Sequence, residues 1–176
     1  RLTLNPLAHL DPIGAIMLLL VHFGWAKPVP VNFDNLRNPK RDMVFVSIAG
    51  PTANIIVAVI SAIFARILFA MNYSIPPQIF TPLISILGFS VLINCALAIF
   101  NIIPIPPLDG SKILMGLLPY NKTLWISRIE PYGFIILILL VVTGAVGVIM
   151  VPVSFLTQIF MGKTLFLGLF GGFFRE

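Results

Sequence analysis

The chain has 176 residues, of which 59% are hydrophobic and 10% charged, with a mean hydropathy of +1.05 and a formal net charge of +5. A soluble globular domain carries about 25% charged residues, so this chain has too few to cover a surface that faces water. Intrinsic disorder requires low hydrophobicity and is also excluded. The composition therefore predicts a membrane protein. Its basic residues are scattered through short connections, which indicates membrane topology and no nucleic-acid partner.

The apolar stretches define the predicted elements in chain order. The hydrocarbon core of a bilayer is about 30 Å thick, so a helix needs about 20 apolar residues to cross it. The run at 13–23 is about half that length, and we expect a short or re-entrant helix there; the alternative is a span completed by upstream sequence. Four later stretches are long enough to span, at 43–71, 79–104, 131–151 and 155–174. We predict an all-α fold, a polytopic transmembrane helical bundle.

Basic residues separate the two sides of this bundle. The connections at 25–42 and 109–130 carry basic residues, whereas the turn at 72–78 carries no charge. The first two spans form a hairpin, so both basic connections lie on the same side. Because cytoplasmic loops are enriched in Lys and Arg, we expect 25–42 and 109–130 in the cytoplasm of a multi-pass cell-membrane protein.

Two basic residues fall inside the predicted spans. Arg66 lies near the outer end of 43–71, where its long side chain can reach the interface. Lys163 falls midway along 155–174, so either this segment lies in the interface or the side chain faces protein or water. We expect an interfacial or loosely inserted C-terminal helix.

The first span carries a stripe of small and polar residues at helical spacing: Gly50, Ala53, Asn54, Ala58, Ser61, Ala62 and Ala65. Such a stripe lets helix backbones approach closely, and packing is its simplest explanation. Asn54 differs, because alanine would pack as well without the free-energy cost of an amide inside the membrane. A cross-helix hydrogen bond and a functional role are both open for it.

The second span ends in NIIPIPPLDG at 101–110, a sequence that breaks a helix. Asn94 and Asn101 are seven residues apart and share a helix face. The three prolines lack N–H groups, so carbonyls four residues earlier lose their helical donors: those of Phe100, Ile102 and Ile103. At membrane depth such carbonyls are tolerated only beside a cavity or other protein.

Asp109 follows this break directly, and Gly110 after it permits unusual backbone angles. A carboxylate at the end of an unwound intramembrane helix is a candidate functional residue. The alternative is a solvated Asp at an interfacial helix end. The visible residues are chemically incomplete, because a zinc site needs about three protein ligands and no H-E-x-x-H, catalytic triad or nucleotide-binding motif is present. His9 and His22 are not expected to ligate zinc, and Asp11 is expected to cap the helix that starts near Pro12.

Four motifs together resemble the site-2 protease family of polytopic zinc metalloproteases, in its compact prokaryotic branch without a PDZ domain. They are NPLAHLDPIG at 5–14, FGWAKPVPVN at 23–32, AGPTAN at 49–54 and NIIPIPPLDGSKIL at 101–114. The resemblance covers about residues 1–115 in order and is specific as a combination, although AGPTAN alone would be weak. It implies hydrolysis of peptide bonds in membrane-spanning substrates, with Zn²⁺ as cofactor in the complete protein.

The resemblance also implies roles for individual residues. The LDG aspartate of the family is the third zinc ligand and falls on Asp109, while the other two ligands and the catalytic glutamate come from an HExxH motif on an earlier helix. The substrate-binding residues implied here are Asn54, Asn101, Pro104 and Pro106. Because HExxH is absent, the chain is either a fragment or a degenerate homologue; its non-Met start and intact LDG favour a fragment that is inactive alone.

We therefore predict one membrane-embedded domain over 1–176, with 1–115 as the site-2-protease-like core and 116–176 as C-terminal transmembrane or interfacial helices. The expected partners are a transmembrane protein substrate and the lipid bilayer, and the oligomeric state is unknown. Two rival functions stay open: a catalytically dead scaffold that binds transmembrane helices, and an ion-coupled transporter. Transporters often have a broken helix in each of two halves, and only one such break is evident here, which counts against a transporter.

Overall fold

The computed structural model describes residues 10–21, 37–144 and 146–172. The chain forms two compact units, 1–36 and 37–176. The described residues form helices and no β-strand, which confirms the all-α fold. The helices are α1 (Pro12–Val21), α2 (Pro39–Ala70), η3 (Asn72–Ser74), α3 (Pro77–Ile102), α4 (Asp109–Leu117), α5 (Tyr120–Ile129), η4 (Glu130–Tyr132), α6 (Gly133–Val142), α7 (Val146–Met161) and α8 (Lys163–Phe170).

The first unit contains α1, a helix of ten residues that is too short to cross a bilayer. Its start is capped as predicted. The carboxylate of Asp11 accepts hydrogen bonds from the backbone N–H groups of Ile13 at 2.9 Å and Gly14 at 3.1 Å. These bonds satisfy donors that the first turn of a helix leaves free.

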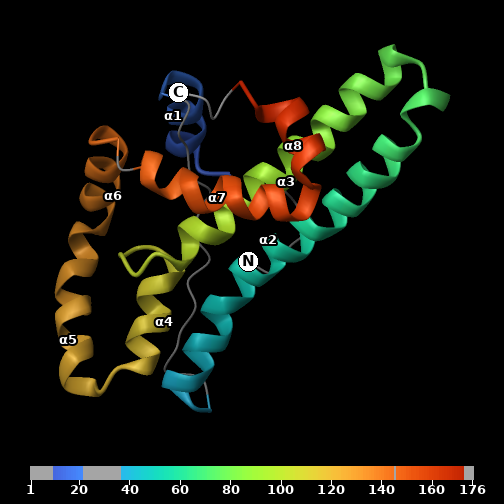
Figure 1. The fold of residues 1–176 in the computed structure, drawn as a ribbon. Helices are drawn as coiled ribbons and strands as arrows, with labels where there is room; N and C mark the ends of the chain where they lie inside the picture. The colour runs from blue at the N-terminus through green and yellow to red at the C-terminus, as the bar shows by residue number, and fades with distance from the viewer. Residues whose placement is uncertain (1–9, 22–36, 145, 173–176) are drawn as a thin grey trace. The chain divides into compact units, whose positions relative to one another are not determined.

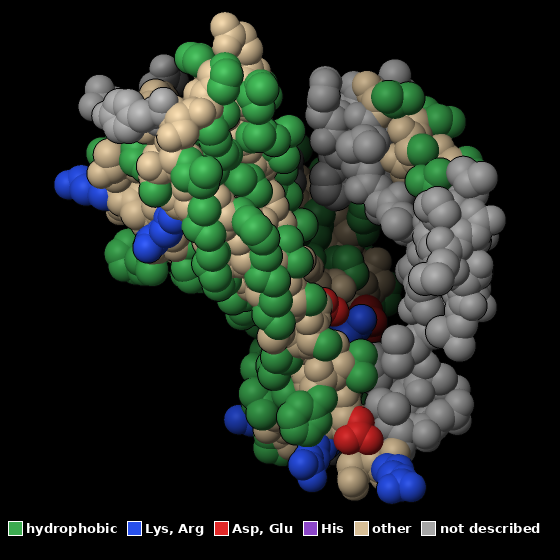
Figure 2. Space-filling model, turned by 90° about the vertical axis from the view of Figure 1, so that its right-hand side faces the viewer, with side chains coloured by type: hydrophobic (Ala, Val, Ile, Leu, Met, Phe, Trp, Pro, Cys, Tyr) green, Lys and Arg blue, Asp and Glu red, His purple; other side chains and the backbone are tan. Residues whose placement is uncertain are grey.

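The second unit is built on a hairpin of α2 and α3, which lie side by side in Figure 1. The hairpin confirms the helices predicted at 43–71 and 79–104. Both helices are long and apolar enough to span a membrane. Figure 2 shows hydrophobic side chains over most of the described surface in that view, with basic side chains at its lower end, at its left and near its centre. The chain is a membrane protein.

The predictions for the C-terminal part have the wrong boundaries. Instead of a span at 131–151, the helical stretch long and apolar enough to span runs over Lys122–Leu140, through α5, η4 and α6, so part of the connection predicted at 109–130 is helical. Instead of one span at 155–174, the chain forms α7 and α8, separated at Gly162. The breaks coincide with Gly144 and Gly162, which have φ values of 74° and 85°, a conformation that glycine adopts at little cost.

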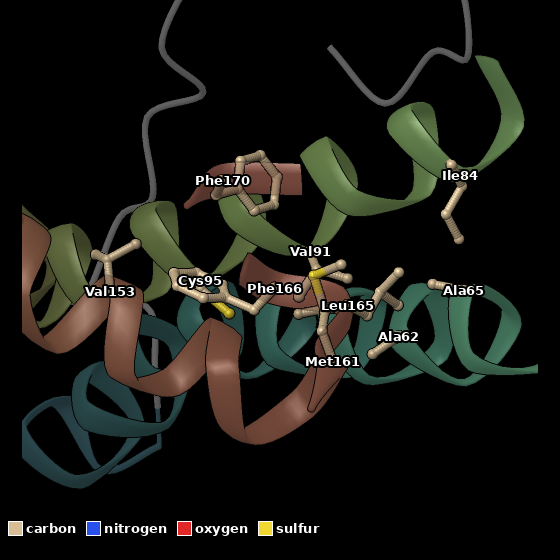
Figure 3. Packing of buried hydrophobic residues seen from close by; sticks show 11 residues of the cluster. Ala62, Ala65, Ile84, Val91, Cys95, Val153, Met161, Leu165, Phe166 and Phe170 are labelled. Atoms are coloured by element: carbon tan, nitrogen blue, oxygen red, sulfur yellow. The ribbon is translucent and has the colours of Figure 1, made fainter. Parts of the chain in front are cut away.

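The main core lies where α7 and α8 pack against α2 and α3 (Figure 3). The predicted small-residue stripe of α2 contributes four buried residues, which confirms its packing role there: Ala58, Ser61, Ala62 and Ala65. Small side chains on α2 let the neighbouring backbones approach closely. Larger partners fill the space from the other helices: Val91, Cys95, Val153, Met161, Phe166 and Phe170.

One polar contact crosses the hairpin within this core. The hydroxyl oxygens of Ser61 on α2 and Ser90 on α3 lie 2.8 Å apart. Hydrogen bonds between membrane helices contribute about 0.6 kcal/mol on average, so we expect Ser61→Ala to lower the free energy of unfolding by about that amount. A double-mutant cycle with Ser90→Ala, measured by denaturant unfolding in mixed micelles, checks this. Strictly additive single-mutant effects would contradict a direct bond.

Candidate functional site

The candidate site is centred on Asp109, the first residue of α4, which is half-buried. The first turn of a helix favours a negative side chain because the free N–H groups and the helix dipole are positive there. The carboxylate lies against α2: a Cβ on Gly50 would be 3.2 Å from its Oδ2. The side chain therefore faces a neighbouring helix at a point where the neighbour has no side chain of its own.

Glycines allow the close approaches that place Asp109. A Cβ on Gly110 would overlap the carbonyl oxygens of Ile102 and Ile103, so α4 starts directly against the end of α3. A Cβ on Gly116 would meet Val44 and lie 2.8 Å from the carbonyl oxygen of Lys40, so α4 also packs closely on α2. Gly110 was expected to provide an unusual backbone angle. That reason was wrong, because the residue has no positive φ and its missing side chain is what matters.

The segment between α3 and α4 is held by local hydrogen bonds. The carbonyl of Phe100 accepts from the N–H of Ile103 at 3.1 Å, and the carbonyl of Ile103 accepts from the N–H of Ile105 at 2.8 Å. Further on, the carbonyl of Leu108 accepts from both the N–H and the hydroxyl of Ser111. Two of the three carbonyls expected to lose their donors at the proline break have thus gained turn partners.

The three asparagines considered in the sequence lie on α2 and α3. Asn54 is half-buried on α2, four residues after Gly50 and therefore one turn along the same helix face. Asn101 is half-buried in the last turn of α3, next to Ile102, whose carbonyl contacts Gly110. Asn94 is satisfied locally, because its side-chain amide donates to the carbonyl of Ser90 at 2.8 Å.

The two prolines predicted to bind substrate have different surroundings. Pro104 is exposed. Pro106 is buried, and a Cβ on Gly133 would lie 2.5 Å from its carbonyl oxygen, so the start of α6 packs on the proline segment. The backbone of Pro106 is therefore a packing surface for the chain itself.

Ser47 is a buried polar residue near Gly50 that the sequence analysis did not single out. It is 2% exposed, and its hydroxyl has no hydrogen-bond partner among the described residues. It precedes Gly50 by one turn of α2, between the contacts of this helix with Gly116 and Asp109. Pro51 lacks an N–H, so the Ser47 carbonyl also lacks its helical donor. The proline four residues after this serine was the available signal for its free carbonyl.

An apolar groove lies where α2, the end of α3 and α4 meet, and it was likewise not predicted. It has a volume of about 420 Å³ and is lined by Ile48, Pro51, Thr52, Ile55, Ile102 and Ile113. Ile113 lies one turn after Asp109 on the same face of α4. The groove is therefore formed by the same three helix segments that surround the carboxylate.

Asp109 is the one acidic residue that the prediction of a metal ligand places at this site. Within 10–21, 37–144 and 146–172, no three His, Cys, Asp or Glu side chains lie close enough together to hold a metal ion. His9 and His22 lie outside the described residues. The Asp109 carboxylate is half-buried, and any side chain at position 50 would crowd it. Such a carboxylate can serve as one oxygen ligand of a Zn²⁺ ion. A complete zinc site requires further ligands.

These features define an all-helical membrane protein with a carboxylate at the end of a broken helix, and the comparisons with known proteins place it in a family. The model of peptidase family M50 matches residues 12–144. The chain belongs to this family, which confirms the site-2 protease resemblance.

Two relatives are named as zinc metalloproteases. The chain is 40% identical over 143 residues to "Putative zinc metalloprotease YwhC" of Bacillus subtilis (strain 168), an alignment that covers 81% of this chain and 65% of that protein. It is 29% identical over 150 residues to "Putative zinc metalloprotease Rip2" of Mycolicibacterium smegmatis, with 83% and 55% covered. The chain thus spans less than two thirds of either relative. No solved structure matches it significantly.

Proposed function

We propose that this chain is the part of an intramembrane zinc metalloendopeptidase that supplies Asp109 as a zinc ligand and binds the unwound segment of a membrane-spanning substrate. The observation that carries the proposal is the position of Asp109 at the break between α3 and α4, with its carboxylate against Gly50. Membership of family M50 and the names of both relatives support the same activity.

Asp109 would bind the zinc ion through a carboxylate oxygen. When bound, zinc supplies Lewis-acid polarisation of a water molecule and of the scissile carbonyl. The family resemblance assigns the other two ligands and the catalytic glutamate to an HExxH helix of the full-length protein. The role of α2 is to accommodate the carboxylate, because Gly50 leaves room for it.

Substrate contacts are proposed for Asn54, Asn101, Pro104 and Pro106. The two asparagines can donate to and accept from the peptide groups of an unwound substrate. Since the Phe100 and Ile103 carbonyls already accept turn hydrogen bonds, the amides are the better candidates for holding substrate backbone. The exposed ring of Pro104 can contact substrate directly, whereas Pro106 would act through the shape of the segment.

We further propose that 1–176 forms one membrane-embedded domain and that its Asp109 side faces the cytoplasm of a multi-pass cell-membrane protein. The start of α2 carries Lys40 and Arg41, and Lys40 donates to the carbonyl of Leu118 at the end of α4 at 2.8 Å. Basic residues at this end of the hairpin support a cytoplasmic location.

The apolar groove beside Asp109 gives a prediction about substrate choice. We expect Thr52→Phe to fill the groove and lower kcat/KM for a substrate with a large apolar residue near the scissile bond by about tenfold, a typical effect of a misfit in a hydrophobic pocket. Cleavage assays with the full-length protein and substrates differing at that residue check this. Val57→Phe, on another face of α2, is the matched control, and equal effects of both variants would contradict a substrate groove.

The proposed activity is tested with the full-length protein reconstituted in lipid with a transmembrane substrate. We expect cleavage that a chelator abolishes and added zinc restores. Cleavage that is indifferent to chelation would contradict metal-dependent chemistry. Retention of zinc and substrate without any cleavage would instead identify a scaffold.

A further inference from the structure

Arg66 and Lys163, the two basic residues that fell inside predicted spans, line one cavity. It has a volume of about 340 Å³ and lies where the end of α2 meets the break between α7 and α8. Both side chains are exposed, and no acidic residue is among the described residues that line the cavity. Two cations with no acidic side chain among the described lining residues attract an anion to this cavity.

The geometry around Arg66 shows how this cavity forms. Its Nη2 donates to the carbonyl of Ile159 in the last turn of α7 at 3.0 Å, which satisfies an acceptor that the helix end leaves free. A Cβ on Gly162 would lie 3.7 Å from the same nitrogen. A guanidinium carries five N–H donors, so this bond uses only part of its capacity. Gly162 also places Lys163 at the first position of α8, which explains why a lysine interrupts the apolar sequence.

Two apolar grooves extend from the cationic cavity. One, of about 230 Å³, runs between α2 and α7 and shares Arg66 with it; its other lining residues are Val59, Ala62, Ile63, Ile159 and Phe160. From Arg66 to Val59 this groove follows α2 towards the middle of the span. The second, of about 250 Å³, lies between α3 and α8 and shares Phe69, Thr164 and Leu165 with the cavity.

From this arrangement we propose a binding site for an anionic glycerophospholipid, with its phosphate at Arg66 and Lys163 and its acyl chains in the two grooves. Arg binds phosphate with paired N–H donors, and basic pockets between membrane helices bind anionic headgroups. A free phosphate would meet the same cations, but it would leave both grooves without an occupant. The site lies about 24 Å along α2 from Gly50, given a rise of 1.5 Å per residue.

The test is native mass spectrometry of the full-length protein in detergent with equal amounts of dioleoyl phosphatidylglycerol and dioleoyl phosphatidylcholine. We expect one phosphatidylglycerol to be retained preferentially. Each basic residue near a headgroup should contribute about fivefold, so Lys163→Gln lowers the apparent affinity about fivefold and Arg66→Gln with Lys163→Gln about 25-fold. The matched control removes two exposed cations from α5, Lys122→Gln with Arg128→Gln, and should leave retention unchanged.

Two further arms separate the possible outcomes. Ile63→Trp, which obstructs the groove between α2 and α7 without changing charge, should reduce lipid retention, while Ile60→Trp, outside the groove, should not. Inorganic phosphate at millimolar concentration should not displace the lipid. Displacement by phosphate, or equal losses in the control and the double variant, would overturn the proposal. If circular dichroism shows that the double variant loses helicity, the single variant Lys163→Gln decides the test, because this exposed lysine is not packed in the core. Unchanged lipid retention in Lys163→Gln would then overturn the proposed site.

Discussion

Asp109→Asn in the full-length protein is expected to reduce both zinc retention and substrate cleavage by at least about 100-fold, since loss of a residue that merely supports a ligand already costs 10–100-fold. Asparagine keeps the size of the side chain and its place at the start of α4, but it removes the negative charge that suits a zinc ligand. Metal content after purification and initial cleavage rates in reconstituted lipid measure the two effects. Membrane insertion should not change.

The matched control is Asp42→Asn, which changes another half-buried acid in the first turn of a helix. Asp42 accepts a hydrogen bond from the N–H of Asn38 at 3.1 Å, and asparagine can accept the same bond. This variant should retain zinc and activity. Wild-type turnover in Asp109→Asn, or parallel losses in both variants, would remove Asp109 from the site.

Gly110→Ala is expected to destabilise the protein by about 3 kcal/mol, at the upper end of the range for overpacking. The added methyl group would overlap the backbone carbonyls of Ile102 and Ile103, and backbone yields less easily than the end of a side chain. Relief would require α4 to move away from α3 and would carry Asp109 away from Gly50. Denaturant unfolding in micelles measures the destabilisation, and cleavage should fall with it.

Gly147→Ala is the control for Gly110→Ala. A Cβ on Gly147, in the first turn of α7, meets nothing within 4 Å among the described residues. Alanine favours a helix over glycine by up to about 1 kcal/mol, so this variant should be neutral or slightly more stable. If Gly110→Ala were equally well tolerated, the close contact between α3 and α4 would be wrong.

The sequence predicted the hairpin well because long apolar runs report burial in lipid directly. Hydropathy gives no comparable signal for the ends of the later helices, because Gly144 and Gly162 interrupt apolar sequence without changing its polarity. Lys163 was the one visible indication. A charge in the middle of an apolar run was consistent with a helix boundary, and the structure places it at the start of α8.

The candidate site was partly predictable for a similar reason. The prolines at 104, 106 and 107 predicted a broken helix, and Asp109 was predicted as a site residue because it directly follows that break. The partner of Asp109 was not predictable, because the approach of Gly50 depends on how α2 packs against α4. The groove beside it depends on three segments that are distant in sequence, and Ser47 gained interest only once its hydroxyl was seen to lack a partner among the described residues.

The role of Asp109 is tested most directly by locating zinc in crystals of the full-length protein by anomalous diffraction at the zinc absorption edge. We expect a peak at about 2.0–2.2 Å from a carboxylate oxygen of Asp109. A fully occupied zinc site elsewhere in the protein, with the Asp109 carboxylate turned towards bulk water, would contradict it.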